Sequence, residues 1–147
     1  MDKKDFINCF DSLLKPLGFK KKSNWWRIET VEIEKVINLQ RSGYSNLYYI
    51  NYGYNLKGLK YEGVVMHIYN RLWHTDKKTI KCISDTLDLE SKIRTAKRME
   101  NIKMIVEKLL IPKIDEINCE NDILIMLQSR AHLNDIPIKV KEYLKLE

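Results

Sequence analysis

Between residues 23 and 72 the chain alternates apolar and polar side chains, and this period of two constrains the fold more than any other feature. The segment is rich in Val, Ile, Tyr and Trp, which suit the pleated, half-buried surface of a β-sheet. Short polar or glycine-containing interruptions predict four strands, at about Asn24–Glu29, Val31–Gln40, Asn46–Leu56 and Val64–Leu72. Because parallel neighbours need long crossover connections, these closely spaced strands predict an antiparallel meander.

The same alternation assigns side chains to two faces, since successive residues of a strand point to opposite sides of a sheet. One face is almost wholly apolar, and we expect helices to bury it. Its members are Val31, Ile33, Ile37, Leu39, Tyr48, Ile50, Tyr52, Tyr54, Leu56, Val64, Met66, Ile68 and Leu72. The opposite face is largely polar, and we favour the register of the first strand that adds Trp25, Arg27 and Glu29 to it. Its other members are Glu32, Glu34, Val36, Asn38, Gln40, Leu47, Tyr49, Asn51, Val65, His67, Tyr69 and Arg71.

A helical pattern precedes the strands. Apolar residues recur at steps of three and four between Asp5 and Leu17, which predicts an amphipathic helix. Pro16 and Gly18 predict that it ends near Lys15. Proline disfavours helical geometry in the residue before it, and glycine suits a left-handed C-cap.

A second helical pattern follows the strands. Apolar side chains step by three and four from Leu89 to Leu109, which predicts a long amphipathic helix with a basic outer side. The basic residues near that side are Lys92, Arg94, Lys97, Arg98, Lys103 and Lys108. Pro112 is expected to end or kink this helix, and shorter helices are expected over Asp122–Arg130 and Ile136–Leu146.

The chain has 147 residues, which is enough for one domain with a core and too few for two of ordinary size. Its 44% hydrophobic and 31% charged residues are typical of a globular protein rather than a disordered one. We therefore expect a single α+β domain over residues 1–147. It would consist of an N-terminal helix, a four-stranded antiparallel meander sheet, and C-terminal helices packed on one sheet face.

The three cysteines, Cys9, Cys82 and Cys119, are odd in number and far apart in sequence. They predict reduced thiols rather than a disulfide framework or a CxxC metal site. We expect no signal peptide and no membrane span, because the longest aliphatic run is Ile123–Leu127 and a spanning helix needs about 20 apolar residues. The sequence thus predicts a cytoplasmic protein without a membrane partner, and it leaves the oligomeric state open.

Four strings of residues, present in a fixed order, are similar to a known family. They are Leu14-Lys15-Pro16-Leu17-Gly18-Phe19-Lys20-Lys21-Lys22 followed by Trp25 or Trp26, then Val36-Ile37-Asn38-Leu39-Gln40-Arg41-Ser42, then Tyr48-Tyr49-Ile50-Asn51, and then His67-Ile68 with Arg71-Leu72. On these residues the first half of the chain resembles the bacterial family called domain of unknown function 4304. The resemblance implies a bacterial origin and a single α+β domain, and it brings no established activity. Some relatives look like neighbours of toxin and immunity genes.

The polar sheet face is the main candidate site. With the register above it brings together Arg27, Asn38, Gln40, Asn51, His67 and Arg71, with Tyr49 and Tyr69 beside them. These side chains can offer several hydrogen bonds and two permanent positive charges to a carboxylate, a phosphate or a peptide. The alternative is that they form only the solvated face which an open antiparallel sheet ordinarily has.

A second candidate is a basic and aromatic segment that begins before the first strand. Lys20, Lys21, Lys22 and Trp25 indicate single-stranded nucleic-acid binding, since lysine neutralises phosphates and tryptophan stacks on bases. The net charge of +6 agrees with this. The alternative is a solvated lysine turn beside a core tryptophan.

The sequence predicts no catalytic residue, no metal site and no cofactor. His67, His74 and His132 lack the spacing of metal-binding motifs, and no glycine-rich phosphate loop is present. His67 with Glu32 or Glu34 is the one pair that could act as acid and base, so enzymatic activity stays open with the balance against it.

These observations favour non-enzymatic recognition of a protein or peptide partner through the polar sheet face. An immunity protein would fit the size and the missing catalytic signature. An inhibitor of a basic nuclease should however be acidic, and this chain is basic. Binding of single-stranded nucleic acid through residues 20–27 is the alternative.

Overall fold

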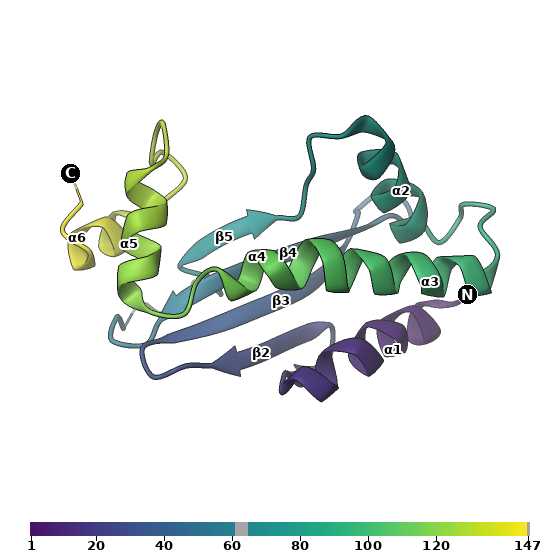
Figure 1. Ribbon diagram of the computed structural model, residues 1–147, viewed down its shortest axis with the longest axis horizontal. Helices are drawn as coiled ribbons and strands as arrows, with labels where there is room; N and C mark the ends of the chain where they lie inside the picture. The colour runs from purple at the N-terminus through teal and green to yellow at the C-terminus, as the bar shows by residue number, and fades with distance from the viewer. Residues whose placement is uncertain (61–64, 147) are drawn as a thin grey trace.

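The computed structural model describes residues 1–60 and 65–146. Its centre is one antiparallel sheet in which the strands follow one another in chain order (Figure 1). The strands are β1 (Lys20–Lys22), β2 (Trp25–Glu29), β3 (Ile33–Arg41), β4 (Tyr48–Leu56) and β5 (Ile68–Arg71). The predicted α+β class and antiparallel meander are confirmed.

The predicted count of four strands is wrong, because the described residues form five. The additional strand is β1, in which Lys20 pairs with Arg27 and Lys22 pairs with Trp25. Three consecutive lysines have no apolar alternation, so the sequence pattern gave no sign of a strand there. The pairing uses backbone groups, and all three side chains remain exposed.

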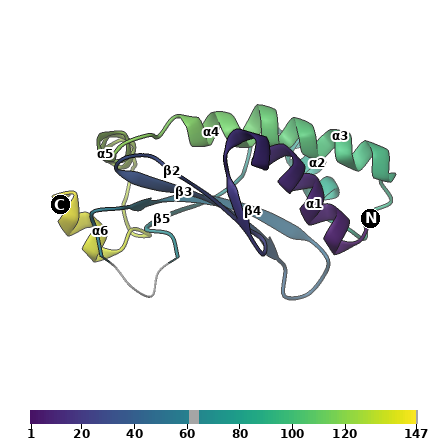
Figure 2. The same ribbon diagram turned by 90° about the horizontal axis from the view of Figure 1, so that it is seen from below.

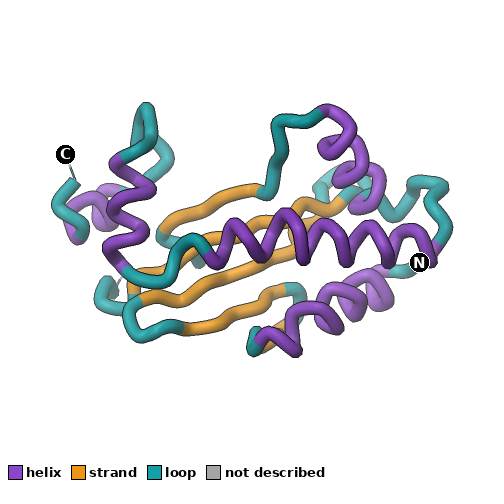
Figure 3. The backbone as a smooth tube through the Cα atoms, viewed as in Figure 1, coloured by secondary structure: helices purple, strands orange, loops and turns teal. Residues whose placement is uncertain are grey.

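Helices precede and follow the strands along the chain. They are α1 (Lys3–Leu14), the 3₁₀ turn η1 (Lys15–Leu17), α2 (Lys77–Leu87), α3 (Thr95–Met104), the π-helical segment η2 (Ile105–Leu110), α4 (Ile111–Asp115), α5 (Glu120–Gln128) and α6 (Ile138–Tyr143). Figure 3 shows α3, η2 and α4 as one nearly continuous rod along the sheet. None of the helices within residues 1–60 and 65–146 is long and apolar enough to cross a membrane. The cytoplasmic location stays a prediction.

The N-terminal helix forms where its apolar periodicity predicts. Asp2 caps it by accepting a hydrogen bond from the Asp5 backbone N–H, 2.8 Å away. Its buried face packs on the sheet, where the Phe6 ring lies 5.0 Å from the ring centroid of Tyr48 and the Phe10 ring lies 6.4 Å from that of Trp26. Gly18 then adopts φ = 98°, so the left-handed C-cap expected of this glycine is confirmed.

Helices α1, α2, α3 and α4 lie on the same side of the sheet (Figure 2). The side chains between this layer and the sheet form the larger apolar cluster, which includes Ile37, Ile50, Ile102 and Val106. Buried apolar area is the main favourable contribution to such a fold. The opposite side of the sheet, called the open face below, has no described helix over it.

A second apolar cluster covers the end of the sheet near the β3 start and the β4 end. There Ile33 and Leu56 pack with Ile123 of α5 and Val140 of α6. The expectation that all C-terminal helices pack on one face is therefore only partly right. Helices α5 and α6 sit at the end of the sheet instead of extending the layer formed by α3 and α4 (Figures 1 and 2).

The region after β5 differs most from the prediction. The helix expected from Leu89 begins only at Thr95, and the preceding helix α2 was not predicted. Pro112 neither ends nor interrupts the helical rod, because it occupies the first turn of α4, where a backbone donor is not needed. The wider turns of η2 immediately precede that turn.

Two residues of the predicted long helix differ in burial from the prediction. Arg98, expected on the basic outer side, is 2% exposed. Its guanidinium donates to backbone oxygens of Asp85, Thr86, Asp88 and Ser91, which lie at and beyond the C-terminal end of α2. Met99, expected in the apolar stripe, is 49% exposed.

Candidate functional site

The open face is where the structure places most of the predicted site residues. Asn38 pairs with Asn51 across β3 and β4, and Asn51 pairs with Arg71 across β4 and β5. Val36, Gly53 and Tyr69 form the parallel row beside them. The predicted face assignment of β2, β3 and β4 is thus confirmed, including the register that puts Arg27 on the open face opposite Val36.

Asn51 is the centre of a side-chain network on this face. Its Nδ2 donates to Gln40 Oε1 at 2.8 Å and to Asn38 Oδ1 at 3.3 Å. Its Oδ1 accepts from the Tyr69 hydroxyl at 2.7 Å and from Arg71 Nε at 3.3 Å. Because Asn51 is only 3% exposed, these bonds fix both ends of its amide group. These five residues are called the Asn51 network.

Arg71 is held at the edge of the network by neutral groups. Its Nη2 donates to Gln40 Oε1 at 3.0 Å and to the Tyr69 hydroxyl at 3.3 Å. Its guanidinium carbon lies 4.0 Å from the ring centroid of Tyr49, which is a cation–π contact. Among the described residues, no carboxylate lies within ion-pair distance of it. Its positive charge is therefore oriented, and no carboxylate of the described residues neutralises it.

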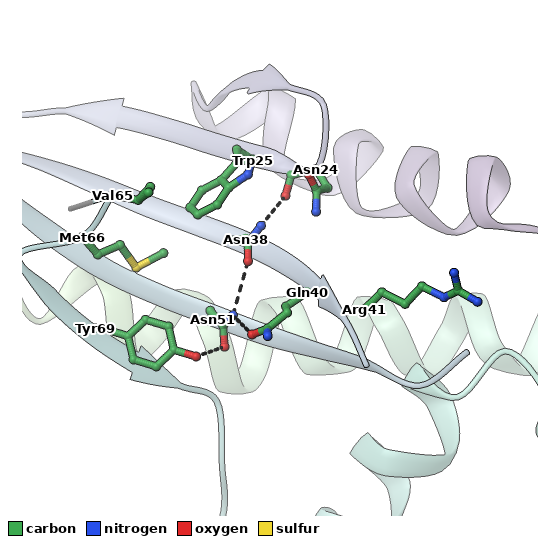
Figure 4. A pocket seen from close by; sticks show the side chains of 9 residues that line it. All are labelled: Asn24, Trp25, Asn38, Gln40, Arg41, Asn51, Val65, Met66 and Tyr69. Atoms are coloured by element: carbon green, nitrogen blue, oxygen red, sulfur yellow. Dashed lines mark hydrogen bonds between the residues drawn. The ribbon is translucent and has the colours of Figure 1, made fainter. Parts of the chain in front are cut away.

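A pocket of about 630 Å³ lies over the Asn51 network, and it is called the amide pocket below (Figure 4). Asn38, Gln40 and Asn51 line its floor, Trp25 stands on one side, and Met66 and Tyr69 stand on the other. Asn24 lines it next to Trp25, and its backbone oxygen accepts from Asn38 Nδ2 at 3.3 Å. The pocket thus combines amide groups at its base with aromatic and thioether walls.

Gly53 makes the Met66 wall possible. A Cβ atom at this position would lie 2.0 Å from the Ile68 backbone oxygen and 2.8 Å from Met66 Sδ, which is closer than any real contact. The chain before β5 therefore passes over the open face at Gly53. Met66, predicted on the helix-covered face, lines the amide pocket because β5 begins only at Ile68. Val64, predicted on the same covered face, lies outside the described residues.

Arg27 and His67 belong to a separate group on the open face. Arg27 Nε lies 3.6 Å from Glu34 Oε1, and its guanidinium carbon lies 5.3 Å from the Trp25 ring centroid. Asn55 Nδ2 also donates to Glu34 Oε1, at 3.0 Å, and Asn55 Oδ1 accepts from the backbone N–H of His67 at 2.7 Å. Unlike Arg71, Arg27 faces a carboxylate, so the protein itself neutralises its charge.

His67 has a structural role in the strand pairing. It is 6% exposed, and its Nδ1 accepts a hydrogen bond from the Leu56 backbone N–H at 2.9 Å. Burial lowers the pKa of His67, and the negative charge of Glu34 opposes that shift. The neutral imidazole is the form that can accept this bond.

The predicted nucleic-acid residues adjoin this face at its β1 edge. Lys20, Lys21 and Lys22 line a second pocket, of about 540 Å³, together with Arg27 and Glu34. Trp25 is half-buried in the wall of the amide pocket rather than inside the apolar core. The tryptophan in the core is Trp26, which is fully buried and donates from Nε1 to Asp11 Oδ1 at 3.1 Å.

Sequence reasoning missed three residues of the open face that the structure uses: Asn24, Asn55 and Met66. Asn24 lies in the turn before β2, and Asn55 lies in the strand register beside Asn51 and Gly53, so strict alternation indicated the place of Asn55. Within the part of the chain that the structure describes, no group of His, Cys, Asp and Glu side chains could hold a metal ion.

These features define an α+β protein with helices on one face of an antiparallel sheet and an amide-lined pocket on the other. The chain belongs to the family described as domain of unknown function (DUF4304), whose match covers residues 10–116. The match runs from the C-terminal part of α1 through the whole sheet to α4, and it leaves α5 and α6 outside. No curated protein and no solved structure matches the chain. The expected bacterial origin stays a prediction.

Proposed function

We propose that the protein binds a protein or peptide partner on its open face, without catalysing a reaction. The observation that supports this most directly is the Asn51 network beneath the amide pocket. Amide groups with fixed orientation select a hydrogen-bonding pattern, and Arg71, which has no ion-pair partner among the described residues, favours an acidic group. Aromatic residues and arginine are also the types enriched at interface centres, and Trp25, Tyr49, Tyr69 and Arg71 share this face.

The pocket leaves donors that a partner can use. Gln40 accepts through Oε1 from Asn51 and Arg71, while its Nε2 has no hydrogen-bond partner among the described residues. The Trp25 indole N–H is likewise without a partner in residues 1–60 and 65–146. Both side chains line the amide pocket. Backbone carbonyl oxygens of a peptide would satisfy such donors.

Photo-crosslinking from the pocket wall tests this proposal. A photoreactive amino acid at Val65, which is 50% exposed and lines the amide pocket, is compared with the same group at Ile125, which is 57% exposed on α5. In a lysate of the source cell we expect one protein to be crosslinked from Val65 and not from Ile125. The Arg71→Ala variant should lose that product. Equal products from both positions would contradict the proposal.

Single-stranded nucleic acid is the second candidate partner, because β1 aligns Lys20 and Lys22 with Arg27 and Trp25 along one edge of the open face. Lysine side chains at that edge can neutralise phosphates while Trp25 offers a ring for stacking. One face of Trp25 is already near the Arg27 guanidinium, at 5.3 Å, which reduces the area open to a base.

Titration of fluorescent oligo-dT and oligo-U at low and moderate salt distinguishes the two partners. Nucleic-acid binding requires an affinity that falls with salt and is lost in a Lys20→Ala/Lys22→Ala variant. A Lys77→Ala/Lys78→Ala variant is the matched control, since those exposed lysines lie on α2. Binding that both variants weaken equally would be non-specific and would exclude the β1 edge as a site.

A further inference from the structure

A third pocket, which is mainly apolar, lies directly beside Arg71. It has a volume of about 160 Å³, and it is bounded by α2 and by the ends of β4 and β5. Its aliphatic lining includes Ile50, Leu72, Ile80, Ile83 and Leu87. Trp73 stands at this pocket with 66% of its surface exposed. This cavity is called the apolar pocket.

Arg71 connects the two pockets. It lines the apolar pocket, and its hydrogen bonds to Gln40 and Tyr69 attach it to residues that line the amide pocket. Its Nη1 donates to no group of the described residues. This guanidinium is held by Asn51, Gln40 and Tyr49, and among the described residues no carboxylate lies within ion-pair distance of it. With its free donor capacity it is prepared to bind an anionic oxygen.

The size of the apolar pocket limits what can enter with that anion. A cavity of about 150 Å³ lined by aliphatic side chains binds benzene. The apolar pocket therefore has room for one side chain of the size of leucine or phenylalanine, and a long acyl chain would not fit. A ligand that satisfies both features has a carboxylate within a few bonds of a single apolar group.

We propose that Arg71 and the apolar pocket together bind the C-terminal residue of a peptide. The α-carboxylate lies on Arg71, the apolar side chain enters the apolar pocket, and the preceding residues cross the amide pocket toward Trp25. A C-terminal residue is the point of a peptide at which a carboxylate and an apolar side chain share one carbon atom. This inference rests on the proposed function and specifies the partner segment.

The amide pocket supports the same direction of binding. Gln40 Nε2 and the Trp25 N–H can donate to peptide carbonyl groups upstream of the C-terminus, while Arg71 stays on the carboxylate. An internal acidic side chain would place its charge farther from the backbone and would not also fill the apolar pocket. Arg71 and the apolar pocket thus recognise the charge and the side chain of the terminal residue, and the amide pocket contacts the residues before it.

The test uses fluorescent pentapeptides with four randomised positions and a fixed last residue. Mixtures ending in Leu or Phe are titrated as free acids and as C-terminal amides, and mixtures ending in Ser are the side-chain control. We expect the free acids ending in Leu or Phe to bind at least tenfold more tightly than their amides and than the Ser mixture. Equal affinities of acids and amides, or no binding of any mixture, would overturn the inference.

Variants assign the two contacts separately. Arg71→Gln should abolish the difference between acid and amide, whereas Ile83→Phe, which reduces the apolar pocket, should abolish only the preference for Leu and Phe over Ser. Arg94→Gln is the matched control, because Arg94 is exposed at the start of α3 and lines neither pocket, and it should change neither. If Arg71→Gln leaves the acid preference intact, the assignment to Arg71 is wrong.

The two experiments distinguish the C-terminal inference from the proposed function. If crosslinking from Val65 succeeds while the free acids do not bind, only the C-terminal inference is wrong. If both experiments fail, the proposed function is wrong as well.

Discussion

The imidazole of His67 replaces a backbone acceptor for Leu56, whose N–H it binds at 2.9 Å through Nδ1. This contact continues the pairing of β4 beyond the last backbone pair of β5, Tyr54 with Ile68. Asn55 Oδ1 completes it by accepting from the backbone N–H of His67. Two side chains therefore do at this point what backbone groups do in the rest of the sheet.

Protonation of His67 should destabilise the fold. Burial lowers its pKa in the folded state, with Glu34 opposing, so folding favours the neutral form. The stability that His67 contributes is present above its unfolded pKa of about 6.5 and is lost as the pH falls through the lower folded value. Urea denaturation between pH 7.5 and 5 should show wild-type stability falling in that window, and less so in His67→Gln. The exposed His132 supplies the control, since His132→Gln should keep the wild-type slope.

Replacement of Arg98 should be strongly destabilising although the residue lies in a basic helix. Arg98→Ala removes a buried guanidinium that donates to four backbone oxygens and to Ser91 Oγ. Losing this buried set of hydrogen bonds should cost about 3 kcal/mol in the free energy of unfolding. Arg94→Ala, at an exposed position at the start of α3, should change it by less than about 0.5 kcal/mol. Equal losses in the two variants would show that α2 does not depend on Arg98.

A methyl group at Gly53 should loosen β5. Its Cβ would lie 2.0 Å from the Ile68 oxygen, so Gly53→Ala should lower the free energy of unfolding by about 2 kcal/mol or more. Amide hydrogen exchange should rise first in Ile68–Arg71. Gly43 has nothing within 4 Å of such an atom, so Gly43→Ala should leave stability unchanged or slightly raised. Unaltered exchange in β5 of Gly53→Ala would contradict this account.

Truncation of Asn51 should affect both stability and binding. Asn51→Ala leaves Asn38 Oδ1 without its donor and removes the acceptor shared by Tyr69 and Arg71, which should cost about 2 kcal/mol. The exposed Asn134 provides a neutral comparison in Asn134→Ala. Thermal unfolding measures the cost, and a partner identified by crosslinking should bind Asn51→Ala more weakly even below its melting temperature. Unchanged affinity there would separate the network from the binding site.

The face assignment of the central strands could be predicted because it depends on a local rule. Side chains alternate along β3 and β4, so Ile50 is covered by helices and Asn51 is open. The rule failed where the alternating pattern extended beyond the strand, as at Met66, which precedes the start of β5. It also failed at Val31, expected to be covered, which precedes β3 and is 92% exposed.

Helix α2, the burial of Arg98 and the hydrogen bonds of the Asn51 network were not predicted, for different reasons. Helix α2 has an N-cap at Asp76 and apolar residues at Ile80, Ile83 and Leu87, with helical spacing, so its sequence contained a usable pattern. The burial of Arg98 could not be read in the same way, because it follows from carbonyl groups of α2 and its following loop that only the folded chain brings near. The network around Asn51 combines residues from three strands, and alternation indicates their common side but not their hydrogen bonds.

The second apolar cluster lies directly behind one part of the open face. Tyr54 and Leu56 pack with α5 and α6 on one side of β4. Gly53 and Asn55 alternate with them in the strand and therefore face the other side. One backbone therefore bears both sets of side chains. A molecule bound over Gly53 and Asn55 on the open face would therefore be separated from α5 and α6 by the single layer of β4.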